Sequence, residues 1–280
     1  VLSQTYTRWE ALVVDNYSSD NTDELIKGFC DSRIKLFKIH NNGIIAASRN
    51  LGIKYSLGNY VAFLDSDDWW MSNKLEESLK YLETGLDIVY HDLFVVTKIE
   101  QRYYWRKTRT RESKSPVFED LVINGNTLNN SSVVVRKSVL DNIGGLSEDR
   151  SLIATEDYNA WLRVAKYTER FKKIPQTLGY YWMGGKNTSN PERTLRILKA
   201  FEEQYHDLIL DLNLQNRIYW LSYARGKSYY NLGLYRKAKV NLSHVLFMRA
   251  KLDIKIKSLT MILIGSFKSF FYRFRARPNE

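Results

Sequence analysis

The chain has 280 residues, of which 44% are hydrophobic and 26% charged, and this balance excludes a disordered chain because it can bury one large core or two modest ones. The single cysteine, Cys30, excludes an internal disulfide, and we expect it on the buried face of a helix in a reducing compartment. The net charge of +11 favours an anionic partner, which is a nucleic acid, a nucleotide or an acidic lipid surface.

Short apolar runs alternate with helical patterns over the first 92 residues. Strands are expected at 11–14, 34–39, 60–64 and 87–90, and helices at 22–29, 44–57 and 73–82. This alternation predicts a mostly parallel α/β sheet with helices on both faces. Open sheets of this kind bind ligands beyond the carboxyl ends of their strands. We therefore expect Asp15 and Asp65, which end two of the strands, to point at a site.

The remaining elements are expected in the following order. The aromatic and basic stretch 103–107 is either a strand or a mobile loop, 127–135 is a strand, 137–143 a short helix, and 155–166 a helix with an acidic start. After Pro191 the pattern changes to long helices, so we expect an α/β domain over 1–190 and a helical region over 191–280. Residues 224–239 have the spacing of one tetratricopeptide-like hairpin. We interpret it as a helical pair packed on the main domain, with a partner-binding role as the alternative.

An acidic cluster, Asp65-Ser66-Asp67-Asp68, directly follows the apolar strand at 60–64. Two carboxylates one residue apart in a turn can converge on one hard cation, and Mg²⁺ and Mn²⁺ complete such shells with substrate phosphates. The metal would offset charge that develops on a diphosphate leaving group. The alternative is that these acidic residues cap the next helix.

Three further positions carry chemistry. Asp15 is either a hydrogen-bond acceptor for a base or ribose or a turn former. Arg49 lies on a helix with an apolar face and is either a solvated residue or a contact of a nucleotide. Glu156 and Asp157 open a helix, where a carboxylate is commonly a cap but would serve as a general base if it faced the pocket.

Together these residues have the order and spacing of a known family. Residues 1 to about 165 resemble the family 2 glycosyltransferases, whose catalytic domain has the GT-A fold. The matching stretches are 1–6 (VLSQTY), 13–22 (VVDNYSSDNT), 42–52 (NGIIAASRNLG), 58–68 (GNYVAFLDSDD), 144–148 (GGLSE) and 155–163 (TEDYNAWLR). The resemblance favours the metal interpretation of the acidic cluster over the capping one.

The resemblance also implies a role for each site residue. It places Asp15 at the uracil or ribose, Arg49 near the nucleotide, Asp65 at the ribose, and Mn²⁺ or Mg²⁺ on Asp67, with Asp68 as the second candidate ligand. Asp157 would be the general base of an inverting displacement, supported by Glu156. The acceptor oxygen would then attack the anomeric carbon opposite the departing UDP.

Similar enzymes build bacterial surface polysaccharides such as O-antigen or capsule. The resemblance therefore implies a UDP-sugar donor carrying a hexose or N-acetylhexosamine, and a lipid-diphosphate-linked saccharide acceptor at the inner face of the cell membrane. Basic residues from Arg249 to Arg277 agree with an anionic membrane surface as partner. Apolar residues at helical spacing among them predict an interfacial helix: Leu259, Ile262, Leu263, Phe267, Phe270 and Phe271. A helix packed on the protein's own core is the alternative.

Two features depart from the family pattern. No first strand with a Pro-Thr-Tyr-Asn-like motif precedes Val1, and we expect the natural protein to carry about thirty further residues whose strand lies between those ending at Asp15 and Asp65. Gly184 stands where many members have a metal-completing histidine, so the metal would depend on the diphosphate and the aspartates. His91 is expected to be an ordinary loop residue.

Two rival functions belong to other classes. A catalytically silent member would bind a nucleotide or a lipid-linked glycan as an assembly factor, and the intact Asp67 and Asp157 argue against it. A nucleic-acid binder is suggested by the net charge, but the chain has no recognisable nucleic-acid motif, so we expect no nucleic-acid partner.

Overall fold

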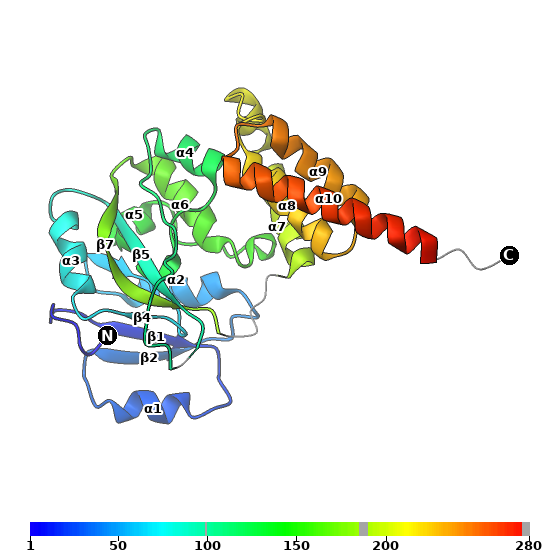
Figure 1. Cartoon of the computed structure of the whole chain (residues 1–280). Helices are drawn as coiled ribbons and strands as arrows, with labels where there is room; N and C mark the ends of the chain where they lie inside the picture. Colours follow the sequence, from blue (N-terminus) through cyan, green and yellow to red (C-terminus); the bar gives the residue numbers. More distant parts are fainter. Residues whose placement is uncertain (99, 185–189, 276–280) are drawn as a thin grey trace. The chain divides into compact units, whose positions relative to one another are not determined.

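The computed structural model describes residues 1–98, 100–184 and 190–275. The chain divides into two compact units, an N-terminal unit of residues 1–121 and 126–187 and a C-terminal unit of residues 122–125 and 188–280. Figure 1 shows strands and helices mixed in the N-terminal unit, whereas its long helices α7 to α10 belong to the C-terminal unit. The short segment 122–125 thus groups with the helical unit, although it lies within the α/β part of the sequence.

The first elements of the N-terminal unit form a small parallel pair of strands. They are β1 (Ala11–Asp15), α1 (Thr22–Gly28), β2 (Ile34–Lys38) and α2 (Ile45–Tyr55). Their bounds confirm the strands and helices expected from the sequence to within two residues. The parallel register places Asp15 opposite Lys38, so the carboxyl ends of both strands meet at one edge.

The other strands form a five-stranded mixed sheet in the order β3-β6-β5-β7-β4. The elements are β3 (Tyr60–Ala62), β4 (Trp69–Trp70), α3 (Lys74–Leu82), β5 (Ile88–Val96), α4 (Val117–Asn124), β6 (Val134–Arg136), α5 (Lys137–Asn142), α6 (Glu156–Tyr167) and β7 (Phe171–Trp182), with 3-10 turns at Asn130–Ser132 and Arg150–Leu152. Only β5 and β7 run parallel in this sheet, since β6 and β4 are antiparallel to their neighbours. In the described residues β1 and β3 belong to separate sheets, and the strand expected between them stays a prediction.

Several local expectations differ from the structure. Cys30 is exposed, not buried, because α1 has no buried residue and the chain leaves the helix at Cys30 with φ of +48°. His91 is a fully buried residue of β5, not a loop residue, and burial lowers its pKa to about 3. The strand expected at 127–135 is shorter, because residues 130–132 form a turn before β6.

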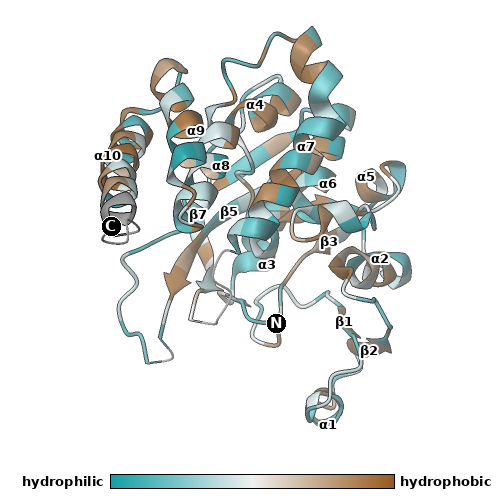
Figure 2. Cartoon of the chain, turned by 90° about the vertical axis from the view of Figure 1, so that its right-hand side faces the viewer, coloured by the Kyte–Doolittle hydropathy of each residue, from teal (hydrophilic) through white to brown (hydrophobic). Residues whose placement is uncertain are grey.

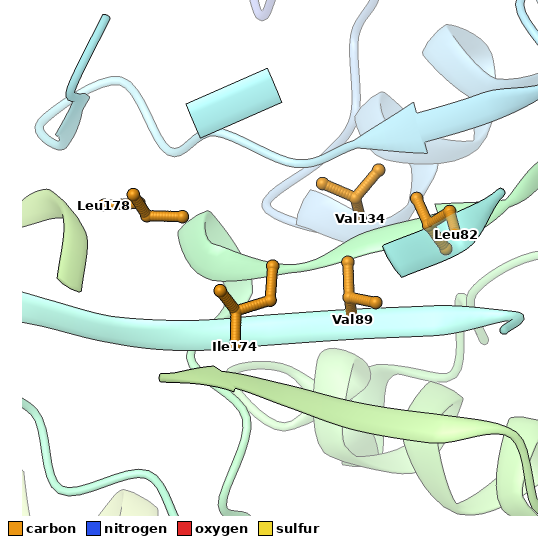
Figure 3. Packing of buried hydrophobic residues seen from close by; sticks show 5 residues of the cluster. All are labelled: Leu82, Val89, Val134, Ile174 and Leu178. Carbon is orange, nitrogen blue, oxygen red and sulfur yellow. The ribbon is translucent and has the colours of Figure 1, made fainter. Parts of the chain in front are cut away.

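One part of the core of the N-terminal unit lies between α3 and strands β5, β6 and β7. This cluster takes one or two apolar side chains from each of these four elements, all at most 3% exposed: Leu82, Val89, Val134, Ile174 and Leu178 (Figure 3). Because β5, β6 and β7 are adjacent strands, this cluster fixes their register and with it the position of their carboxyl ends.

A buried carboxylate joins the start of β5 to the end of β6 and to the turn before β7. Asp87 is fully buried, and its oxygens accept from Arg136 Nε at 3.1 Å, Arg170 Nε at 2.8 Å and Thr168 Oγ1 at 2.7 Å. Burial alone would raise the pKa of Asp87, but these three donors outweigh it and hold the pKa below its ordinary value. Asp87 therefore stays ionised in the folded protein and joins β5 to β6 and to the turn before β7.

The C-terminal unit is a set of packed helices: α7 (Pro191–Asp211), α8 (Tyr219–Asn231), α9 (Tyr235–Phe247) and α10 (Leu252–Arg275). The α8–α9 pair confirms the helical hairpin expected at 224–239. Gly226 allows the close packing, because a Cβ at this position would come within 2.6 Å of Leu242 Cγ. None of the helices in the described part of the chain has an apolar stretch long enough to cross a membrane.

We expect Asp87→Ala to lower the free energy of unfolding by about 3 kcal/mol or more, because it leaves Arg136 without its buried anion. Urea denaturation followed by circular dichroism measures the change. Lys80→Ala is the control, since it removes an exposed ion pair with Glu77 that contributes at most about 1 kcal/mol. Equal losses in the two variants would show that Asp87 does not anchor the sheet.

Candidate functional site

The first part of the site is an ionised carboxylate at the end of β1. Asp15 is buried, and Lys38 Nζ lies 2.6 Å from its Oδ2 atom. The Ser18 backbone N–H donates to the same oxygen at 3.0 Å, and the Ser18 hydroxyl donates to Oδ1. These contacts, with Lys38 as the largest, lower the pKa of Asp15 to about 2. Asp15 thus shapes the turn that follows β1 and presents it at the edge of the sheet.

A pair of aromatic rings lies beside Asp15. Tyr17 and His40 stack with ring centroids 3.9 Å apart and an interplanar angle of 12°. Tyr17 is 54% exposed, and its backbone is in the left-handed region with φ of +54°. Each residue lies two positions beyond a strand end, which was the only sequence signal for them. The pair offers a flat surface on which a planar ring can stack.

The second part of the site is a partly buried arginine that joins two carboxylates. Arg49 Nη2 lies 2.8 Å from Asp65 Oδ1, and Nη1 lies 2.6 Å from Glu156 Oε1. Burial works against the charge of Arg49, but the charges of Asp65 and Glu156 outweigh it and raise the pKa of the guanidinium. The interpretation of Arg49 as a solvated residue is therefore wrong, because only 14% of its side chain is exposed.

The other two acidic residues of the cluster have contrasting environments. Asp68 is buried; its Oδ1 accepts from the Trp182 backbone N–H at 2.9 Å, whereas its Oδ2 has no hydrogen-bond partner in the described residues. Burial, helped by the charges of Asp67 and Asp65, raises the pKa of Asp68 to about 6. Asp67 is exposed. The cluster is followed by β4 and not by a helix, so the capping interpretation is wrong.

Asp157 lies in the first turn of α6, beside Glu156. The Tyr158 backbone N–H donates to its Oδ1 at 2.6 Å, and Asn126 Nδ2 lies 3.4 Å from its Oδ2. Burial is the main cause that raises the pKa of Asp157 to about 6, and the charge of Glu156 adds to it, while Arg49 opposes the shift. A carboxylate with a pKa near neutrality is suited to accept and release protons at physiological pH.

Tyr181, near the end of β7, is affected by the charges of these carboxylates. Burial raises its pKa, and so do four negative charges, listed here in order of effect: Asp68, Asp67, Asp65 and Asp157. The charges that act on Tyr181 come from two distant segments of the chain, which Arg49 joins through its pairs with Asp65 and with Glu156. Sequence reasoning missed this residue because no pattern identified β7 as a strand.

The acidic cluster fits a cation only in part. No three His, Cys, Asp or Glu side chains of the described residues stand close enough together to hold a metal ion. Asp67 is exposed and Asp68 has an unpartnered buried oxygen, so one or two carboxylates are available. Mg²⁺ is often bound by one or two carboxylates together with substrate phosphates. Gly184 adds no ligand, and a Cβ there would clash with the Trp182 indole.

Comparison with curated proteins gives relatives of one kind. WfgD of Escherichia coli, a UDP-Glc:α-D-GlcNAc-diphosphoundecaprenol β-1,3-glucosyltransferase, is 43% identical over 97 residues, which are 34% of this chain and 38% of WfgD. TuaG of Bacillus subtilis, a putative teichuronic acid biosynthesis glycosyltransferase, is 38% identical over 84 residues, which are 29% of this chain and 33% of TuaG. The matched region thus spans little more than a third of these relatives.

Comparison with solved structures supports the same fold. The crystal structure of Staphylococcus aureus TarS 1-349 in complex with UDP superposes with a TM-score of 0.54 over 99% of this chain and 86% of that one, at 13% identity. At this identity the likeness shows the fold alone, which is the GT-A fold expected from the sequence. The model of the family "Glycosyl transferase family 2" matches residues 1–144, and the chain belongs to this family.

Proposed function

We propose that the protein is an inverting glycosyltransferase that moves a hexose or N-acetylhexosamine from a UDP-sugar to a lipid-linked saccharide. The observation that carries the proposal is that Arg49 joins Asp65 of the acidic cluster, at 2.8 Å, to Glu156 at the start of α6, at 2.6 Å, beside Asp157. This arrangement combines a place for a diphosphate-bound cation with a carboxylate whose pKa of about 6 suits a general base.

The donor nucleotide is assigned to the carboxyl ends of β1 and β2. The stacked Tyr17 and His40 offer a flat surface for a uracil ring, and the Asp15 turn offers polar contacts beside it. Asp65 is 39% exposed at its side chain while it holds Arg49, so it remains accessible to a ribose hydroxyl. Two similar proteins support UDP over other nucleotides, since WfgD is named for UDP-Glc and TarS was crystallised with UDP.

The acceptor and the place of action follow from the relatives. WfgD and WfaP, both of Escherichia coli, are named for transfer to GlcNAc-diphosphoundecaprenol, a lipid-diphosphate-linked sugar. We assign this chain an acceptor of the same class, in the synthesis of a surface polysaccharide such as O-antigen or capsule. An enzyme with a lipid-linked acceptor works where that lipid is, and we place it on the inner, cytoplasmic face of the cell membrane.

The reaction assigned to the site is a single displacement. The hydroxyl oxygen of the acceptor forms a bond to the anomeric carbon of the donor sugar, and Asp157 accepts the proton of that hydroxyl. The bond from that carbon to the UDP oxygen breaks on the opposite face, and its electron pair leaves with UDP. Mn²⁺ or Mg²⁺ would be held by Asp67, with Asp68 as second ligand, and would offset the negative charge of the leaving diphosphate.

Glu156 is a positioning residue in this scheme. Its carboxylate is bound to Arg49 at 2.6 Å, so it is not available as the base. Its charge instead helps to raise the pKa of the neighbouring Asp157.

We expect Asp67→Asn to lose nearly all transfer and the response to added Mn²⁺, with an unchanged fold because Asp67 is exposed. The assay is UDP release from a UDP-sugar in the presence of acceptor. Asp141→Asn, at another exposed aspartate, is the matched control and should keep full activity. Wild-type rates in Asp67→Asn would remove the metal site from the proposal.

Asp157→Asn should lower turnover by about 10²- to 10⁴-fold, the usual cost of removing a general base. Binding of UDP, measured by calorimetry, should persist because Asp157 is not placed at the nucleotide. Loss of UDP binding together with activity would instead assign Asp157 to the donor pocket. If the wild-type protein binds UDP but releases none from any UDP-sugar, the result would favour the rival function, a catalytically silent assembly factor.

The rate should depend on pH through the ionisation of Asp157. A general base acts in its deprotonated form, so turnover should be level above about pH 7 and fall about tenfold per unit below about pH 6. Glu156→Gln removes a neighbouring negative charge and leaves Arg49 less compensated, so both effects should move this acid limb to lower pH. If the loss of activity at low pH occurs at the same pH in Glu156→Gln, it would be assigned to the protonation of Asp68, whose pKa is also about 6.

A further inference from the structure

Helix α10 carries a continuous apolar stripe on its exposed side. Leu252, Ile256, Leu259 and Leu263 follow one another at intervals of four, three and four residues, and they are 73%, 56%, 47% and 62% exposed. This spacing places them on one face of a helix. Phe267 and Phe270, 64% and 57% exposed, continue the same face. We call these six residues the outer stripe; Figure 2 shows hydrophobic residues recurring along α10.

The opposite face of α10 is fixed against its own unit. Ser258 is fully buried, and Gly265 packs so closely that a Cβ there would lie 3.1 Å from Tyr235 Cδ1 and 3.4 Å from Tyr230 Cε2. Ile262, expected from the sequence on the membrane-facing side, is half-buried instead. Because one face is held by α8 and α9, the outer stripe cannot turn inward without breaking this packing.

The charges beside the outer stripe favour one kind of partner. The start and flanks of α10 carry five cations against one acid, Asp253: Arg249, Lys251, Lys255, Lys257 and Lys268. Lys257 pairs with Asp253 and Lys268 lies over the Tyr230 ring of the packed face, so the excess positive charge is that of Arg249, Lys251 and Lys255 at the start of the helix. Two copies of α10 that met along the stripe would bring this excess of like charge together, which opposes self-association. An anionic surface complements the same charges, and exposed apolar residues bordered by cations are typical of a helix that lies in a lipid interface.

We propose that the outer stripe of α10 docks the protein on an anionic lipid surface. The helix would lie along the surface, with the stripe in the acyl boundary over about 27 Å and its cations at the headgroups. The cations at 273 and 275 have undescribed side chains, and residue 277 lies outside the described residues, so none of them supports the assignment. Docking through the outer stripe would bring the protein to the membrane that holds the lipid-linked acceptor of the proposed function. The observations for this docking come from α10 alone.

The test is cosedimentation of the full chain with vesicles of phosphatidylglycerol or of phosphatidylcholine. Wild type should bind the anionic vesicles more tightly, and added salt should weaken that binding. The double variant L259Q/L263Q should lower the partition coefficient about 10- to 100-fold, because it removes two leucines from the face that enters the lipid. The matched control L25Q/L57Q changes two leucines of the N-terminal unit, 55% and 80% exposed, and should bind like wild type.

Three results would overturn the proposal. They are no binding of wild type to the anionic vesicles, equal binding by L259Q/L263Q, and a wild-type dimer in lipid-free light scattering that this variant converts to a monomer. Circular dichroism checks that the variant keeps its helix content. UDP release with a water-soluble acceptor separates this test from that of the proposed function, since L259Q/L263Q should retain it whether or not the protein binds lipid.

Discussion

The site depends on one partly buried ion-pair network, in which Arg49 joins Asp65 to Glu156. Two unit charges 4 Å apart interact by roughly 4 kcal/mol in a partly buried environment, so uncompensated carboxylates would not stay together. Arg49, a residue of α2, offsets this repulsion because its guanidinium pairs with Asp65, which follows β3, and with Glu156, which begins α6. The same side chain thereby joins three elements that are distant in sequence and allows Asp157 to lie near the acidic cluster.

The aspartates of the site differ because their surroundings differ. Lys38 and Ser18 hold the pKa of Asp15 at about 2, so it is a fixed negative charge. Burial raises the pKa of Asp68 and of Asp157 to about 6, which makes these two responsive near neutral pH. One residue type thus serves as a structural anion, a candidate metal ligand and a candidate base, according to burial and partners.

The sequence predicted the local part of this arrangement. The strand end at Asp15 and the acidic start of α6 followed from hydrophobic periodicity and from end signals, which are properties of neighbouring residues. The strand expected to end at Asp65 ends at Ala62 instead. The contribution of β7 did not follow, because its core positions are interrupted by Lys172, Lys173 and Pro175 and its pairing with β4 is long-range. Tyr181 and the Trp182 amide, which complete the acidic cluster, were therefore not predicted. The sheet is mixed where the sequence indicated mostly parallel strands, because β6 and β4 pair antiparallel with strands that are distant in sequence.

We propose that this site transfers a sugar from a UDP-sugar donor. The most direct measurement is nucleotide release from a panel of UDP-, GDP- and dTDP-sugars, with Mn²⁺ and a lipid-diphosphate-linked saccharide. We expect UDP to be released from at least one UDP-sugar, and only when the acceptor is present. The product should carry one additional sugar. A folded protein that binds UDP yet consumes no nucleotide-sugar with any acceptor of this class would contradict it.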